Sequence, residues 1–165
     1  MLKLGTIVKD NITGLSGMLT HAQMEMDKDL IMYYFQPRML NKETGQPIKC
    51  MWLSPVRVVG GVEENDNGTG LFEYQEALGK EAEDIGTTYT GKIVAIQQHI
   101  SGCVHATIQS GKLNTESGEL TDALNTDVRR LKIKGWKLMT EEERKVDQKK
   151  KPSPVSIMVS RFPKM

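Results

Sequence analysis

The chain contains two degenerate copies of one unit, residues 4–59 and residues 78–132. With an offset of 74 residues, which becomes 73 after a single gap, twelve positions are identical in the two copies. They gather at glycines and turn residues, and in the first copy they are Leu4, Gly5, Asp10, Thr13, Gly17, Gln23, Gln36, Leu40, Asn41, Glu43, Gly45 and Arg57. Self-similarity of this kind indicates a duplicated structural unit. Because a unit of about 55 residues is near the lower limit for an independent core, we expect the copies to pack on each other or on a partner.

Each copy reads as short strands separated by turn signals, with almost no helical periodicity. The predicted strands are residues 5–9, 15–24, 30–36, 48–53 and 56–59 in the first copy, and 91–98, 104–109, 120–124 and 128–133 in the second. Such a pattern favours an all-β fold of two tandem SH3-like small β-barrels with a C-terminal extension. The predicted boundaries are a first barrel over residues 1–60, an acidic glycine-rich linker over 61–77, a second barrel over 78–133 and a basic C-terminal arm over 134–165.

The C-terminal arm differs in kind from the two copies. Thr140 followed by Glu143 is a capping-box pattern, so a short charged helix is predicted from there to about Lys150. Residues 155–162, VSIMVSRF, form a predicted terminal strand. This strand would either add to the edge of its own barrel or join the sheet of another subunit.

The third strand of each copy allows its two faces to be assigned. Apolar and polar residues alternate over residues 104–109, so the apolar set is predicted to face the core. The inward set is Val104, Ala106 and Ile108 in the second copy, and Ile31, Tyr33 and Phe35 in the first. Met32 and Tyr34 would then face outward. One possibility is that the sister copy or the linker covers Met32 and Tyr34, since Leu71, Phe72 and Tyr74 of the linker are able to pack against a barrel. The other is that Met32 and Tyr34 belong to a surface that binds a partner.

Charge is distributed unevenly along the chain. The formal net charge is −3 over residues 1–77, −1 over residues 78–133 and +5 over residues 134–165. Because phosphate binding requires a basic field, the two negative copies argue against nucleic acid as the partner. Only the lysine run 149–151 in the tail would supply one. Such a run is usually a solvated segment, and the alternative is that it contacts DNA or an acidic capsid surface.

Targeting and redox signals point to a reduced compartment. No apolar run approaches the roughly 18 residues of a membrane span, and the N-terminal sequence lacks the apolar region of a signal peptide. The two cysteines, Cys50 and Cys103, occupy non-equivalent places in the two copies, so the repeat suggests no disulfide. We therefore expect a cytosolic protein without a membrane partner.

Two clusters in the sequence partly match metal sites. His99, Cys103 and His105 lie within seven residues, but no fourth zinc ligand is evident and the first copy has no counterpart. Residues 63–74 partly mimic a calcium loop, but Tyr74 stands where that loop needs a bidentate glutamate. The sequence also contains no P-loop and no nucleophile elbow. We therefore predict no metal, no cofactor and no enzymatic activity.

The first copy contains four motifs in order: LGTIVKDNITGLSG at residues 4–17, Gln36-Pro37, Gly45-Gln46-Pro47 and Trp52. With these motifs it resembles a small repeat of tailed-bacteriophage and prophage proteins. The second copy has the Gly102-Cys103 pair of that repeat but Asn125 in place of the tryptophan. The resemblance covers about two thirds of the chain, and it implies a virion accessory protein that decorates the capsid or belongs to the collar or tail.

We therefore predict a non-enzymatic structural protein of a tailed-phage particle, found in the virion and in the host cytoplasm during assembly. It would bind other virion proteins, namely major capsid, collar or tail subunits, in multiple copies per particle. The predicted interface residues are Met32, Tyr34, Met51, Ile157, Val159 and Phe162. The alternative is a regulatory or nucleic-acid-associated SH3-like binding module.

Overall fold

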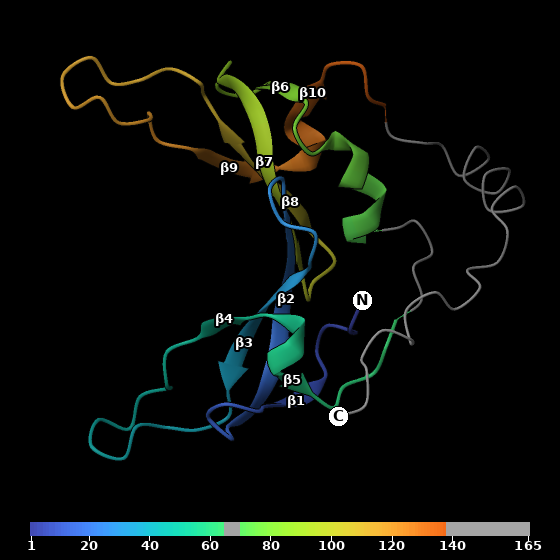
Figure 1. Ribbon diagram of the computed structural model, residues 1–165, viewed down its shortest axis with the longest axis vertical. Helices are drawn as coiled ribbons and strands as arrows, with labels where there is room; N and C mark the ends of the chain where they lie inside the picture. The colour runs from blue at the N-terminus through green and yellow to red at the C-terminus, as the bar shows by residue number, and fades with distance from the viewer. Residues whose placement is uncertain (65–69, 138–165) are drawn as a thin grey trace, which may run out of the picture.

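The computed structural model describes residues 1–64 and 70–137 and shows an all-β chain built on one open antiparallel sheet (Figure 1). In the first copy the elements are β1 (Ile7–Asp10), β2 (Ser16–Glu25), β3 (Met32–Pro37), β4 (Met51–Leu53), the 3-10 helix η1 (Pro55–Arg57) and β5 (Val58–Val59). In the second they are β6 (Glu81–Asp84), β7 (Thr90–His99), β8 (Val104–Gln109), β9 (Leu124–Asp127), η3 (Val128–Arg130) and β10 (Leu131–Ile133). Every element of one copy thus has a counterpart in the other.

The two copies share the same strand pairing. In each, the first strand pairs with the second and the last, the second also pairs with the third, and the third pairs with the fourth. The prediction of a strand over residues 120–124 was wrong, because β9 begins only at Leu124. The prediction also missed β6, and it extended both closing strands into residues that form η1 and η3.

Strands β2 and β7 join the copies into one sheet. Each is ten residues long, pairs with its own first strand near its beginning and pairs antiparallel with the other copy's long strand near its end. At the centre of that pairing Gln23 lies opposite Gln97, and these are equivalent positions of the repeat. The two copies are therefore related by a local pseudo-twofold axis, as the subunits of an isologous dimer would be.

A β-bulge in each long strand adds to this junction. The ladders of β2 and β7 shift register at the equivalent residues Thr20 and Val94. The carbonyl of Thr20 accepts a hydrogen bond from the Ile100 N–H, and that of Val94 from the Met26 N–H, each at 2.8 Å. Each bulge thus binds the hairpin turn of the sister copy, and the backbone polar groups that the bulge frees are satisfied across the junction.

The segment between the copies ends in the 3-10 helix η2 (Gly70–Ala77), just before the second copy begins. This helix packs against β7 and β2 and buries Leu71, Tyr74 and Ala77. The Leu71 N–H donates to the Gln98 side-chain oxygen at 2.7 Å. The predicted packing of Leu71 and Tyr74 is confirmed, whereas Phe72 is only half-buried.

The tail predictions, a helix near residues 140–150 and a strand over 155–162, lie outside the described residues. Within residues 1–64 and 70–137, no helix has the length and apolar character needed to cross a membrane.

The buried residues of both copies form one cluster. The inward assignment of the third strands is confirmed for Val104, Ala106 and Ile108 and for Tyr33 and Phe35, while Ile31 is only partly buried. This cluster also includes the η2 residues, so the copies and the connecting segment share one core. A shared core meets the expectation that units of this size pack on each other.

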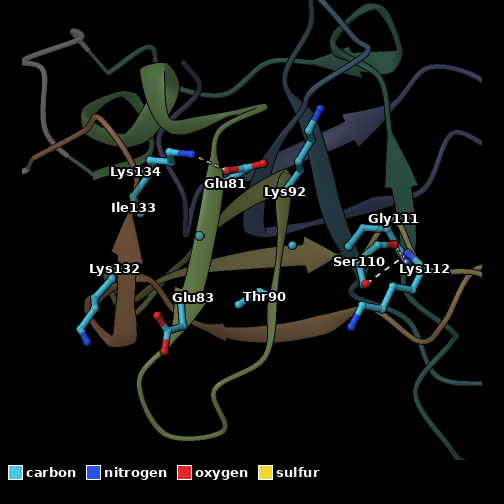
Figure 2. Close-up of a pocket in the computed structure, with 13 residues that line it drawn as sticks. Glu81, Glu83, Thr90, Lys92, Ser110, Gly111, Lys112, Lys132, Ile133 and Lys134 are labelled. Carbon is cyan, nitrogen blue, oxygen red and sulfur yellow. Dashed lines mark hydrogen bonds and ion pairs between the residues drawn. The ribbon is translucent and has the colours of Figure 1, made fainter.

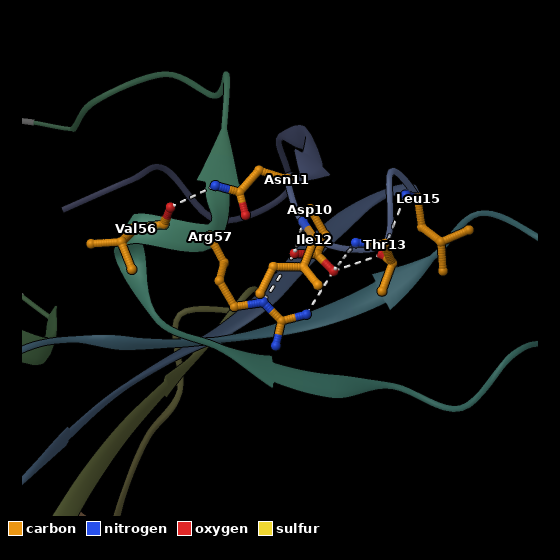
Figure 3. Close-up of polar contacts among 7 residues, drawn as sticks. All are labelled: Asp10, Asn11, Ile12, Thr13, Leu15, Val56 and Arg57. Atoms are coloured by element: carbon orange, nitrogen blue, oxygen red, sulfur yellow. Dashed lines mark hydrogen bonds and ion pairs between the residues drawn. The ribbon is translucent and has the colours of Figure 1, made fainter.

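A buried aspartate closes the first turn of each copy (Figure 3). The fully buried Asp10 accepts hydrogen bonds from the Thr13 hydroxyl at 2.6 Å and from Arg57 Nε and Nη2 at 3.0 and 2.7 Å. These hydrogen bonds, Arg57 foremost, hold the pKa of Asp10 well below its usual range, although burial acts in the opposite direction. We call this arrangement the Asp–Thr–Arg latch.

The second copy repeats the latch with Asp84, Thr87 and Arg130. The Thr87 hydroxyl donates at 2.7 Å and Arg130 Nη2 at 2.8 Å to the buried Asp84 carboxylate. The latch accounts for three of the twelve identities between the copies, because the aspartate, threonine and arginine each recur at the same place. In both copies these residues satisfy a buried carboxylate and hold the first turn.

Replacing Arg57 by alanine should destabilise the protein strongly. The substitution leaves a buried carboxylate without its charged partner, which typically costs about 3–5 kcal/mol; we expect the lower end, because the Arg57 side chain is 27% exposed. Urea unfolding at neutral pH measures the loss. Arg129→Ala is the control, since its pair with Asp127 is largely exposed and should contribute less than about 1 kcal/mol. Equal losses in the two variants would contradict a structural role for the latch.

Candidate interaction surfaces

Five ring side chains cross the outer face of the sheet where the two copies meet. Trp52 of β4 contacts Tyr34 of β3, Tyr34 contacts His21 of β2, His21 contacts His99 of β7, and His99 contacts His105 of β8. Their ring centroids are 4.9, 5.2, 4.1 and 4.9 Å apart in that order. We call this set the outer-face row. It contains all three histidines of the chain.

The row lies opposite the core because strand residues alternate between faces. Tyr33 and Phe35 on either side of Tyr34 are buried, as is Ala22 beside His21. The row's members are half-buried, apart from Trp52, whose exposed fraction reaches 36%. Cross-strand aromatic contacts stabilise a sheet, but here they also leave an aromatic surface in contact with solvent.

Polar neighbours orient two of the histidines, His21 in the middle of the row and His105 at its end. The Thr20 hydroxyl lies 2.8 Å from His21 Nδ1, and the Asn125 side-chain oxygen lies 3.1 Å from His105 Nδ1. Burial, followed by the neighbouring imidazoles, lowers the pKa of His21 and of His99. The rings of His21 and His99 are therefore neutral at pH 7.

The structure brings His99 and His105 together but assembles no metal centre from them. Among the described residues, no group of three or more His, Cys, Asp or Glu side chains is placed to bind a metal ion. Cys103 is exposed, and the other cysteine, Cys50, donates to the Gln36 side-chain oxygen at 2.6 Å. The calcium-like segment falls partly on residues 65–69, outside the described chain.

Two long arms project from the sheet, residues 38–50 between β3 and β4 and residues 111–123 between β8 and β9. In the view of Figure 1 both arms extend to the left of the sheet. Side-chain hydrogen bonds tie the two legs of each arm together: Gln36 Nε2 donates to the Ile48 carbonyl at 3.3 Å, and Gln109 Nε2 donates to the Thr121 carbonyl at 2.6 Å. Gln36 and Gln109 are equivalent, so the arms have the same construction.

The tip of each arm is an asparagine turn. The Asn41 side-chain oxygen accepts hydrogen bonds from the Glu43 and Thr44 N–H groups at 2.8 and 3.0 Å. Asn114 binds the equivalent Glu116 and Ser117 N–H groups at 2.9 and 3.3 Å. Gly45 and Gly118 follow with φ of 68° and 70°, a conformation that glycine adopts without strain. The arms are thus shaped by their own hydrogen bonds.

Apolar side chains are exposed on both arms. Leu40 and Leu113 are equivalent and each is 58% exposed, and Leu120 is 56% exposed. They form isolated bridges, Leu40 with Pro47 and Leu113 with Leu120. At the base of the first arm lies a hollow of about 470 Å³, lined by Gln36, Pro37, Arg38, Met39, Leu40 and Pro47. Exposed apolar side chains beside a hollow are typical of protein-binding surfaces.

The sequence-predicted interface residues fall in different places. Tyr34 lies in the outer-face row, and Met32 lies on the same face of β3, opposite Gln23. Met51 pairs with Phe35 and packs against the buried cluster, so Trp52 is the β4 residue that joins the row. The other three, Ile157, Val159 and Phe162, lie outside the described residues.

Sequence reasoning missed the arm leucines and the gathering of the histidines. The leucines carried a signal, because Leu40-Asn41 and Leu113-Asn114 are identical in the two copies and stand next to a turn. No sequence signal indicated that the histidines lie together, since His21 and His99 become neighbours only through the pairing of β2 with β7.

Comparisons with known proteins found no match: no protein-family model, no curated protein and no solved structure is detectably similar to this chain.

The lowered pKa values of His21 and His99 predict a loss of stability in mild acid. The unfolded chain takes up protons near pH 6.5, before the folded chain does. The stabilisation is therefore fully present above about pH 6.5 and is lost as the pH falls through the lowered pKa of each folded histidine. Unfolding free energies at pH 7.5 and pH 5.5 should differ less in the His21→Gln, His99→Gln double variant than in the parent.

Asp127 does not confound this comparison. Arg129 is the main cause that lowers its pKa to about 2, so the Asp127 carboxylate stays ionised over the whole range. An acid-induced loss of the same size in parent and double variant would show that His21 and His99 do not resist protonation.

Proposed function

We propose that this chain is a non-enzymatic structural protein of a tailed-bacteriophage particle and that it binds other virion subunits by docking. The observation that carries the proposal is the duplicated arm, which presents an exposed leucine beside a hydrogen-bonded turn at two equivalent places. The resemblance of the copies to a repeat of phage proteins supplies the setting, namely the virion and, during assembly, the host cytoplasm.

We further propose that each copy is an SH3-like small β-barrel. Support comes from the strand order, in which the first strand lies between the second and the fifth, and from the 3-10 turn before the closing strand. The glycines Gly17 and Gly91 allow the second strand to cross closely over the third, because a Cβ at either position would meet the carbonyl oxygen of Gln36 or Gln109. Strongly bent strands of this kind are typical of small barrels.

The construction of the arms suits docking. An arm whose turn and legs are already hydrogen-bonded loses little conformational freedom when a partner covers its leucines, so less of the binding free energy is spent on ordering. Two arms on one molecule also raise the effective affinity for a partner that offers two sites, as a lattice of repeated subunits does. The outer-face row would supply a second aromatic contact area at the junction.

The exposed leucines of the arms favour a protein partner over nucleic acid, because phosphate groups would gain nothing from apolar side chains. The second arm also carries Glu116, Glu119 and Asp122 against one lysine, Lys112, and would repel phosphate. The first arm carries Arg38, Lys42 and Lys49 against Glu43, so for this arm the argument rests on the leucine alone.

Aspartate at both arm leucines should prevent the chain from joining the particle. A carboxylate at Leu40 and at Leu113 would have to be desolvated in any apolar interface, which is unfavourable. The measurement is the amount of Leu40→Asp, Leu113→Asp protein in purified particles, by quantitative mass spectrometry, relative to the parent chain. We expect a loss of at least about tenfold, the factor that corresponds to about 1.4 kcal/mol.

The matched control carries two new carboxylates at polar positions of the same turns, Thr44→Asp and Ser117→Asp. Equal melting temperatures of the two double variants show that neither has lost its fold. Full incorporation of the leucine variant would contradict docking through the arms, and absence of the parent chain from every particle fraction would contradict the virion setting.

A further inference from the structure

A basic groove lies on the second copy, apart from the arm tips and the outer-face row (Figure 2). It has a volume of about 670 Å³ and extends over β10, β6 and β7 to the start of the second arm. Thr90 and Gly91 lie along it, and Gly91 has no side chain to fill it. Its charged lining consists of Lys92, Lys112, Lys132, Lys134, Glu81 and Glu83.

The lysines of this groove are only partly neutralised. Lys134 Nζ lies 3.2 Å from Glu81 Oε2 in an exposed pair, and Lys132 lies opposite Glu83 in the β10–β6 register. Lys92 and Lys112 form no ion pair with any residue of the described chain. Four lysines against two glutamates leave the groove with a net charge of +2.

The first copy shows that the fold does not require these lysines. At the positions equivalent to Lys92, Lys112, Lys132 and Lys134 it has Met18, Met39, Val59 and Gly61. The two copies keep the same strands, the same latch and the same arm turn, so the same surface exists in both with different chemistry. In the first copy the lysine positions are apolar or glycine, with Met39 45% and Val59 51% exposed, and Lys9 stands at the position of Glu83.

We propose that this groove binds an extended, carboxylate-rich segment of a partner protein. Lys92 and Lys112 at one side and Lys132 at the other would each face a carboxylate of the segment, as charge complementarity requires. A protein segment fits better than a nucleic acid, because the interleaved Glu81 and Glu83 would repel an unbroken run of phosphates. A peptide can place neutral or basic residues opposite those two glutamates.

This inference names a partner chemistry for the proposed docking function and rests on that function only in taking the partner to be a protein. The groove and the arm leucines are tested by different variants and different readouts. Particle incorporation tests the arms, whereas peptide binding in solution tests the groove, so either can fail without the other.

The decisive variant carries Lys92→Met and Lys112→Met, which are the residues of the first copy at the same positions. Because Met18 and Met39 occupy equivalent sites, the variant should keep the fold, and its melting temperature checks this. The control is Lys3→Met with Lys28→Met, which removes the same charge from exposed positions outside the groove.

The probe is a fluorescent peptide in which three glutamates alternate with three serines, so that neutral residues can lie opposite Glu81 and Glu83, with an oligothymidylate of six nucleotides as the competing chemistry. We expect the full chain to bind the peptide at low salt, with weaker binding as salt screens the charges. The groove variant should bind at least about tenfold more weakly, about 1.4 kcal/mol, and the control within about twofold of the parent. Amide chemical shifts of Thr90, Gly91 and Ser110 should move on peptide addition.

Three results would overturn the proposal. The first is peptide affinity that the groove substitutions reduce no more than the control does. The second is oligonucleotide binding as tight as peptide binding, with the same amides perturbed, which would identify the groove as a phosphate site. The third is no peptide binding to the full chain at low salt.

Discussion

The antiparallel pairing of β2 with β7 is the interaction on which the rest of the structure depends. Each unit alone is near the lower size limit for an independent hydrophobic core. The pairing joins the two units into one sheet with one buried cluster. The bulges at Thr20 and Val94 reinforce it by binding the sister hairpins. The same pairing brings His21 beside His99 and so creates the outer-face row. Both the stability of the chain and its aromatic surface therefore arise at one symmetric junction.

Comparison of the two copies distinguishes the residues that the fold requires from the surface residues that can vary. Both copies keep the aspartate, threonine and arginine of the latch, the glycine where two strands cross and the asparagine of the arm tip. These residues satisfy buried charge, close approach and turn geometry, so they are the same for structural reasons. The copies differ at the groove, where Lys92, Lys112 and Lys132 of the second copy replace Met18, Met39 and Val59 of the first. The proposed difference in binding between the copies rests on these exchanges.

Patterns in the sequence predicted the features that depend on residues close together in the chain, such as which face of a strand is buried. The alternation over residues 104–109 identified the buried face of β8 correctly, and the apolar residues Leu71 and Tyr74 were expected to pack. The strand over residues 120–124 was wrong because the Gln109 side chain, rather than a backbone ladder, holds that leg of the arm. Met51 and Trp52 could not be told apart by pattern, since β4 is only three residues long. The β2–β7 pairing was beyond any local pattern, although the identity of Gln23 and Gln97 lay at its centre.

Native-state hydrogen exchange on the full chain tests the central claim, that the β2–β7 junction makes the two copies one cooperative unit. The informative amides are those of Met26 and Ile100, which cross the junction, and those of Phe35 and Ile108 in the two third strands. If the account is correct, all four exchange only through global unfolding, with one common free energy. Exchange of Met26 and Ile100 through a lower-energy opening, while Phe35 and Ile108 stay protected, would show two independent units and contradict it.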